Sequence, residues 1–460
     1  MLYQVRIVKR KFSRRKTTVF GSIAVIIIYF HYLLHYYLPE NASDDLFFHT
    51  KKSKIFQPEL VHNCSAFISK TASKSKLWDA STSFEHKLNY ENEGGSWGDD
   101  FDCEHYINTR LGGFFWNDFS SSEEKSFPLA YTIIAYHNFD QLEQLLLSIY
   151  RPHNFYCLQI DSSALEEFKQ QVEQLVSCIA DTGLSRRLFL SFKPLNIHWG
   201  RPSLLKAELG CMRDLVFQSE RLAEAQGVTG EQGSTQWKYL INLTGEEFPL
   251  VTNKELVSVL SRIRGANILD GGFTQIKPER YPETLPFNLS KYKSSTHFLL
   301  NRKAVEFIIA DSALPKLLYK ALHRYNFLEE SFFAILQYNP RTLFPGGMLV
   351  EPETNLYTNQ NFPRYKVWRD KVEHCPSGMT SRDICVMGIN DLPALVHEAY
   401  GLHFFVNKFY WDYQPAAWDC INVWHHLRSL EEFENGSTSF NPFVFVNSSY
   451  MKYTKPVRGF

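Results

Sequence analysis

The chain has 460 residues, of which 44% are hydrophobic and 15% aromatic, so its composition excludes a disordered chain and allows one large globular domain or two smaller ones. Its formal net charge is zero, but residues 1–16 hold seven Lys and Arg and no acid, which leaves 42 basic against 49 acidic residues beyond them. Residues 17–460 therefore carry a net charge of −7 and have no overall positive field that would attract nucleic acid. Any anion that they bind must be held by a few specifically placed cations.

Residues 17–38 form an uncharged run of 22 residues, and a helix of about 20 apolar residues spans a bilayer. The basic residues before it are expected to stay in the cytosol as a tail over residues 1–16, which places the rest of the chain in the lumen. We therefore expect a type II signal-anchor. A cleaved signal peptide is the alternative, which the length of the run, its aromatic content and the lack of a small-x-small site before Pro39 disfavour.

The cysteines also indicate a luminal chain. An even number of cysteines in such a setting predicts four disulfides, and no CxxC spacing favours zinc. The eight are Cys64, Cys103, Cys157, Cys178, Cys211, Cys375, Cys385 and Cys420. Five sequons are expected to carry glycans: Asn41, Asn63, Asn288, Asn435 and Asn447. A sixth, Asn242, lies at the end of a predicted buried strand and is expected to stay unmodified.

Residues 39–125 are polar and irregular and are interpreted as a stem, followed by a globular domain over residues 126–430 and a C-terminal extension over residues 431–460. Within the domain, apolar runs at 129–136, 155–161, 186–192 and 238–243 predict strands. Between them, apolar spacing predicts a helix capped by Asn138 or Asp140 and another around 203–222. Capping boxes at 163–166 and 252–255 predict two further helix starts, the first with Leu165 on its buried face.

Strands that alternate with helices predict an α/β fold with a mainly parallel sheet and flanking helices. Ligands of such sheets lie beyond the carboxyl ends of the strands. The chain has no GxGxxG string, so the sequence does not support the NAD-binding version of this fold.

Four segments together carry a resemblance to a known family. They are FPLAYTIIAYHNFDQLEQLLLSIYRPHNFYCLQID, WKYLINLTGEEFPLVTNKEL, EESFFAILQ and SRDICVMGINDL. In order and spacing they resemble the core-2/I-branching β-1,6-N-acetylglucosaminyltransferases over roughly residues 60–425. The resemblance implies a GT-A-like, mixed but mainly parallel sheet, a Golgi membrane location, and the disulfide pairs Cys64–Cys420, Cys103–Cys178, Cys157–Cys211 and Cys375–Cys385.

The same resemblance implies a binding site for a UDP-sugar donor. Ala135, Tyr136, His137 and Asp161 follow the first two strands, and Trp199 stands where the family closes the nucleotide site with an aromatic residue. An Asp after an apolar strand can accept hydrogen bonds from a ribose or a uracil. Read alone, Asp161 is more simply a cap for the segment that starts at Ser162.

In transfer from a UDP-sugar the leaving group is a nucleoside diphosphate, and the negative charge that develops on it must be stabilised. The only Asp-x-Asp string, Asp100-Phe-Asp102, precedes the first strand of the domain, and Asp161 is followed by two serines. The resemblance implies a family that needs no metal or other cofactor and uses an Arg and a Lys, matched here by Arg382 and Lys408. Without the matching flanks, either residue would be interpreted as a solvated surface charge.

Inverting transfer needs a carboxylate that takes the proton of the attacking hydroxyl. The family match assigns this role to Glu330, with Glu329 in place of an Asp. The alternative is that both carboxylates have no catalytic role and only stabilise the helix, because acidic residues interact favourably with its positive amino-terminal end.

The acceptor residues implied by the match are Lys277, Arg280 and Trp368. Near them the chain departs from the family: the stretch from Trp368 to Arg382 is shorter, and Asp370 replaces a tyrosine. Glu247 replaces a more usual Asp, and Asp270 is a weak candidate for an acidic acceptor contact. Acceptor or sugar preference is therefore expected to differ.

The expected activity is metal-independent, inverting transfer of GlcNAc or another hexose from a UDP-sugar to a hydroxyl of a mucin-type O-glycan on a glycoprotein, which forms a β-1,6 branch. One alternative is a peptide O-xylosyltransferase, although the chain lacks the extra C-terminal domain of those enzymes. The other is a non-enzymatic, lectin-like relic, which the joint retention of Asp161, Glu330, Arg382 and Lys408 disfavours. The sequence leaves open whether the chain forms a homodimer.

Overall fold

The computed structural model describes part of the chain. The described residues are Cys64, Ser65, Ile68, Trp97, Gly227 and residues 101–107, 120–181, 186–225, 236–272, 276–310, 312–351, 363–368, 375–399, 403–436 and 440–457. The predicted anchor at 17–38 and the sequons Asn41 and Asn63 lie outside them. Among the described residues, none of the helices has the length and apolar character needed to cross a membrane.

A mixed, six-stranded sheet forms the centre of the domain, with the strand order β3-β2-β1-β4-β7-β6. The first four strands in this order run parallel, and β7 is antiparallel to both of its neighbours. The prediction of a mixed, mainly parallel sheet is confirmed. The strands are β1 (Leu129–Ala135), β2 (Phe155–Ile160), β3 (Leu188–Leu190), β4 (Tyr239–Thr244), β6 (Ile268–Gly272) and β7 (Lys293–Asn301).

Four helices cover one face of this sheet: α10 (Pro202–Ala225), α12 (Arg302–Ile309), α13 (Ala313–Leu322) and α14 (Glu329–Tyr338). Alternate strand residues such as Ala130 and Phe155 point to this side, since successive side chains of a strand face opposite ways. They join one apolar core with the inner sides of α10 and α14. The core fixes α14, and with it the first-turn carboxylates of that helix.

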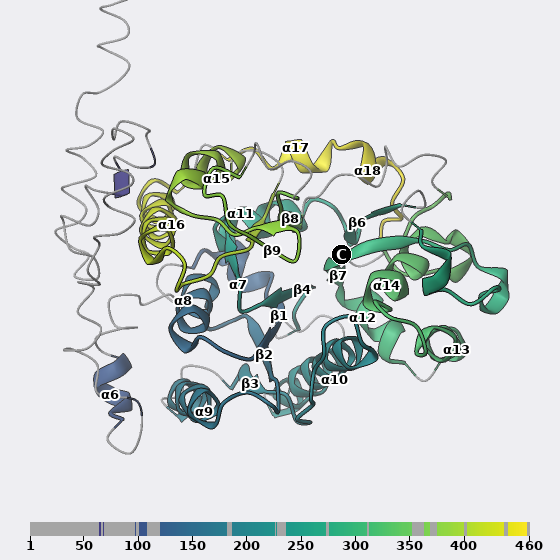
Figure 1. The fold of residues 1–460 in the computed structure, drawn as a ribbon, viewed down its shortest axis with the longest axis horizontal. Helices are drawn as coiled ribbons and strands as arrows, with labels where there is room; N and C mark the ends of the chain where they lie inside the picture. Colours follow the sequence, from purple (N-terminus) through teal and green to yellow (C-terminus); the bar gives the residue numbers. More distant parts are fainter. Residues whose placement is uncertain are drawn as a thin grey trace, which may run out of the picture. The chain divides into compact units, whose positions relative to one another are not determined.

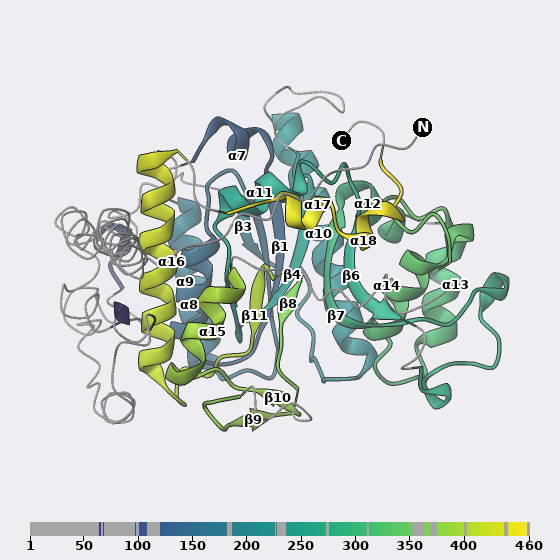
Figure 2. The ribbon, with the colours of Figure 1, turned by 90° about the horizontal axis from the view of Figure 1, so that it is seen from above.

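The opposite side carries α8 (Phe139–Ile149), α9 (Glu166–Asp181) and α16 (Pro415–Asn435), of which α8 and α16 lie side by side (Figures 1 and 2). A smaller sheet has the order β5-β11-β8 and adjoins a hairpin of β9 and β10. These strands are β5 (Glu247–Pro249), β8 (Arg364–Tyr365), β9 (Thr380–Ser381), β10 (Ile384–Cys385) and β11 (Phe405–Asn407). The remaining helices are α6 (Cys103–Tyr106), α7 (Ser122–Ser126), α11 (Asn253–Leu260), α15 (Leu392–Ala399), α17 (Phe443–Val446) and α18 (Ser449–Lys452).

Two of the predicted helix starts are confirmed. Asn138 caps α8, and Thr252 forms a complete capping box with Glu255 at α11. The capping box predicted at Ser163 is wrong, because Ser163 donates to Asp161 and the helix begins only at Glu166. Leu165 therefore precedes the helix and is 76% exposed instead of buried.

Four disulfides join the same cysteines that the family resemblance pairs: Cys64–Cys420, Cys103–Cys178, Cys157–Cys211 and Cys375–Cys385. Two of them tie parts of the expected stem to helices of the domain, since Cys420 lies in α16 and Cys178 in α9. The expected boundary at 430/431 falls inside α16, and the extension beyond it buries Phe445 and Tyr450.

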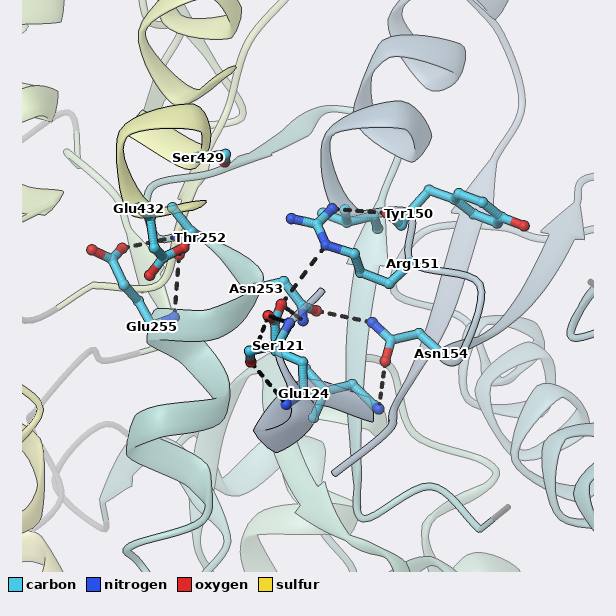
Figure 3. A network of polar contacts seen from close by, with 12 residues as sticks. Ser121, Glu124, Tyr150, Arg151, Asn154, Thr252, Asn253, Glu255, Ser429 and Glu432 are labelled. Atoms are coloured by element: carbon cyan, nitrogen blue, oxygen red, sulfur yellow. Dashed lines mark hydrogen bonds and ion pairs between the residues drawn. The ribbon is translucent and has the colours of Figure 1, made fainter. Parts of the chain in front are cut away.

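The amino-terminal edge of β1 and β2 is closed by a buried polar network (Figure 3). Glu124 accepts a hydrogen bond from Asn253 at 2.7 Å and faces the Arg151 guanidinium at 3.8 Å, while Asn154 donates to Asn253 at 2.9 Å. These contacts satisfy buried polar groups inside the domain and hold α7, α11 and the start of β2 together. The opposite, carboxyl-terminal edge carries the predicted site residues.

Candidate active site

The site lies where parallel strands end, because the loops after β1, β2 and β4 meet at one edge of the sheet. Tyr136 and His137 follow β1, and both side chains are exposed. Ala135 ends β1 and is only 2% exposed, so only its backbone can face a ligand; its carbonyl accepts the amide of Asp161 at 3.0 Å.

Asp161, directly after β2, is 7% exposed and holds the loop around it. One carboxylate oxygen accepts the backbone amide and the hydroxyl of Ser163, each at 2.8 Å. The other accepts the amide of Ile197 at 3.2 Å. The alternative role of Asp161 as a helix cap is wrong, because α9 begins only at Glu166; the Asp161 carboxylate closes a local turn with Ser163 and also holds the loop that leads to Trp199.

The two predicted cations come from different elements. Arg382 and Asp383 form the two-residue turn of the β9–β10 hairpin, with φ of 51° and 63°. Such turns need positive φ at both positions, which is a strained conformation for these residues. The Cys375–Cys385 disulfide braces the hairpin, and the turn presents the Arg382 side chain to solvent.

Lys408 follows β11 and is 4% exposed. Its Nζ lies 3.2 Å from Oε2 of Glu246 and 5.5 Å from the ring centre of Tyr410. The Tyr410 hydroxyl is 2.7 Å from that of Ser381, the residue before Arg382. The structure therefore brings the two cations to one region, with Tyr410 between them.

The carboxylates that follow the central strand β4 do not form an Asp-x-Asp-like pair. Glu246 faces Lys408, whereas Glu247 is fully buried beside Arg364, 3.0 Å away. Glu247 is thus a buried group held inside the domain, and a change of acceptor preference at this position stays a prediction. Asp102 is also engaged elsewhere, since it caps α6.

Among the described residues, one cluster has the residue types of a metal site: Cys375, Cys385 and Asp391. Its two sulfur atoms are joined in a disulfide and cannot bind a metal as thiolates.

Glu330 lies in the first turn of α14 with its side chain 19% exposed. Its Oε2 accepts from Nη1 of Arg280 at 2.8 Å and faces Nζ of Lys293 at 3.3 Å. The carboxylate is thereby fixed in orientation by two cations. Lys293 is a site residue that the sequence analysis missed, and nothing in its flanking sequence signals the role.

Glu329, its neighbour, is 2% exposed. Burial, and to a smaller extent the charge of Glu330, raises the pKa of Glu329 to about 8. A carboxyl group that stays protonated near neutral pH cannot accept another proton. The structure therefore separates the two acidic residues by environment.

A row of cation–ring and ring–ring contacts joins Glu330 to Arg382. The Arg280 guanidinium lies 4.1 Å from the ring centre of Phe327, Phe327 and Trp199 pack edge to face at 4.7 Å, and the Arg382 guanidinium lies 5.1 Å from Trp199. Gly200 permits this contact, because a Cβ there would lie 2.7 Å from the Phe327 ring. Sequence reasoning missed Phe327, which follows no recognisable motif.

The expected acceptor residues are placed less tightly. Lys277 is exposed and precedes the short turn Pro278–Arg280, while Arg280 pairs with Glu330. Trp368 is 46% exposed and pairs through its backbone with Ile384 of the Arg382 hairpin. Asp370 and the side chain of Asp270 lie outside what the structure describes.

The described sequons differ in access. Asn288, Asn435 and Asn447 are exposed. Asn242 is 5% exposed, and its amide donates to the Thr296 carbonyl at 2.8 Å. Its side chain is therefore inaccessible in the folded protein.

A fixed carboxylate can take a proton from a hydroxyl, and two cations in one region can stabilise an anionic leaving group. The chain belongs to the Core-2/I-branching enzyme family, whose model matches residues 129–396. It is 30% identical to a mouse N-acetyllactosaminide β-1,6-N-acetylglucosaminyl-transferase over 72% of this chain and 78% of that protein. It is 27% identical to a bovine β-1,3-galactosyl-O-glycosyl-glycoprotein β-1,6-N-acetylglucosaminyltransferase over 71% of this chain and 75% of that protein.

Proposed function

We propose that the protein transfers a sugar, GlcNAc in the first instance, from a UDP-sugar to a hydroxyl of an O-glycan with inversion at the anomeric carbon, forming a β-1,6 branch. The observation that carries this proposal is Glu330, a carboxylate held by Arg280 and Lys293 and linked to the Arg382 cation through the packed rings of Phe327 and Trp199. Membership of the branching family supports the same reaction class.

In the proposed reaction the acceptor oxygen forms a bond to the anomeric carbon while the bond from that carbon to the diphosphate oxygen breaks. Glu330 takes the hydroxyl proton. Both cations on Glu330 contact Oε2, and no further contact of Oε1 is found in the described part of the chain, so Oε1 is the oxygen offered to the acceptor. A base positioned in this way contributes about 10²–10⁴ in rate.

Arg382 and Lys408 stabilise the charge that develops on UDP, in place of a metal. The separate engagement of Glu246 and Glu247 supports this part of the proposal, because neither is paired with a second carboxylate at the edge of β4. The edge formed by Tyr136, His137, Asp161 and Trp199 is proposed to hold the nucleoside. The proposal includes a type II Golgi membrane location through residues 17–38.

The experiment incubates the full-length chain with each UDP-sugar and a panel of acceptors, with and without EDTA. The panel holds galactosyl-GalNAc, N-acetyllactosamine and a serine peptide, since the relatives are named for the first two classes. We expect transfer from UDP-GlcNAc to a saccharide acceptor that survives chelation. Transfer only to the peptide would instead indicate a xylosyltransferase-like enzyme, and absence of any transfer or donor hydrolysis would indicate a non-enzymatic relic.

A further inference from the structure

Glu246 is a charged residue at the site for which the proposed reaction has no use. It stands two residues beyond β4, with its side chain 17% exposed. Its Oε2 lies 3.2 Å from Nζ of Lys408, and its Oε1 lies 3.9 Å from Nε2 of His137. Partial burial and then the nearby charge of Glu246 raise the pKa of Tyr136.

Because Lys408 is buried, its ion pair with Glu246 matters for the stability of the site. An ion pair in solvent contributes about 0–1 kcal/mol, but a buried charge that loses its partner is strongly destabilising. Lys408 is 4% exposed, so its ammonium needs a compensating anion when no ligand is bound. Glu246 is the carboxylate found next to it.

We propose that Glu246 is the resting partner of Lys408 and that the diphosphate of the donor replaces it. The inference rests on the proposed function and adds a residue that sets donor affinity. In the ligand-free enzyme the ion pair holds the Lys408 side chain in place. When the diphosphate binds, it pairs with the Lys408 ammonium in place of Glu246. The Glu246 carboxylate then lies near a group of the same charge, and this repulsion weakens the complex.

The consequence concerns turnover as well as binding. After transfer, the product UDP must leave two cations, and leaving Lys408 without a partner would oppose its departure. Glu246 re-forms the ion pair as UDP departs and so favours release. Product release limits the rate of many enzymes, so weaker binding of UDP at this step increases turnover. Glu246 thus acts as a positioning residue through Lys408 and makes no bond to the reacting atoms.

The test measures UDP binding to the full-length chain by titration calorimetry for the parent protein and for Glu246→Gln and Glu246→Ala. The control is Glu166→Gln, which removes the same charge from a surface pair with Lys169, 2.8 Å away. We expect the Kd for UDP to fall about tenfold in both Glu246 variants, a change of about 1.4 kcal/mol. The control should stay within about twofold.

Steady-state kinetics supply the second readout. In both Glu246 variants we expect KM for the donor to fall while kcat falls as well, a split that a merely structural defect would not produce. If the parent protein binds UDP and both variants bind it equally well or more weakly, the role of Glu246 is refuted, while the proposed function stands. No UDP binding by the folded parent protein would overturn the proposed function together with this inference.

Discussion

Glu329 and Glu330 are neighbours in the first turn of α14, yet their carboxyl groups have opposite surroundings. Adjacent helical residues point about 100° apart, so one side chain enters the core while the other meets Arg280 and Lys293. The family resemblance could select Glu330 as the base, but only the structure shows why its neighbour is unsuited to the role. The difference is burial, which a sequence pattern of two adjacent acids does not contain.

Replacing Glu329 by Gln should stabilise the protein increasingly as the pH rises. The pKa of Glu329 is raised to about 8 by burial, above the ordinary value of 4.5, so its contribution to stability is present at low pH and is lost as the pH rises through this window. The Glu329→Gln variant has no carboxyl group to ionise, so its free energy of unfolding should exceed that of the parent protein by at most about 3 kcal/mol at pH 7. Thermal unfolding of both proteins between pH 4.5 and 8 measures it; a constant difference would contradict the account.

Arg382→Ala should weaken UDP binding by roughly 10–100-fold, as expected for loss of a charge-assisted hydrogen bond. Its side chain is exposed at a hairpin turn, so the melting temperature should change little. Calorimetric titration with UDP and a thermal melt check the two parts. A large loss of stability with unchanged UDP binding would show that Arg382 is a structural residue.

At the scale of elements, the loop before α10 and the loop before α14 pack against each other, and Gly200 lies at this contact. The Phe327 amide donates to the Gly200 carbonyl at 2.8 Å, and the Phe327 ring lies under the Arg280 guanidinium. The positions of Trp199, Arg280 and Glu330 therefore depend on a glycine that lies outside the catalytic residues.

Gly200→Ala should reduce transfer by at least tenfold, since a Cβ would lie 2.7 Å from the Phe327 ring and displace Arg280 from Glu330. Gly227→Ala is a matched control: its φ of +68° resembles the +69° of Gly200, but nothing lies within 4 Å of its Cβ position. Both variants should lose about 1–2 kcal/mol of stability from the backbone strain, and only the first should lose activity. Equal activities would show that this contact does not position the site.

Element by element, what the sequence predicted well was local. The strands β1, β2 and β4 and the capping box of α11 follow from apolar runs and short polar motifs. The start of α9 was misplaced because Ser163 can cap a helix or bond to Asp161; in the structure it bonds to Asp161, whose other carboxylate oxygen accepts the distant Ile197 amide. Lys293 and Phe327 were missed for a related reason, since they reach the site through long-range packing that no local pattern records.

For the whole molecule, buried ionisable groups should set the pH of greatest stability. Burial raises the pKa of Glu208, Asp419 and Glu432 to about 7 and that of Asp391 to about 6, and these groups lower stability as the pH rises. Burial lowers the pKa of four histidines, and they lower stability as the pH falls. They are His153 and His425, both with a pKa of about 3, and His297 and His426.

These opposing slopes predict a maximum of thermal stability at mildly acidic pH, between about 5 and 6.5. A series of thermal melts from pH 4 to 9 measures it. A stability that rises steadily to pH 9 would contradict the protonated state assigned to the buried carboxyl groups. Four disulfides add to this stability at every pH in that range by restricting the unfolded chain.

The most direct test of the central claim is the rate of sugar transfer by Glu330→Gln, measured beside Glu329→Gln and the parent protein. Gln keeps the shape of the side chain but cannot take the proton of the acceptor hydroxyl, so transfer should fall by at least about 10². UDP binding should be nearly unchanged, and Glu329→Gln should keep most of its activity. Transfer at the parent rate by the Glu330 variant would contradict the account, and loss confined to the Glu329 variant would place the base one residue earlier.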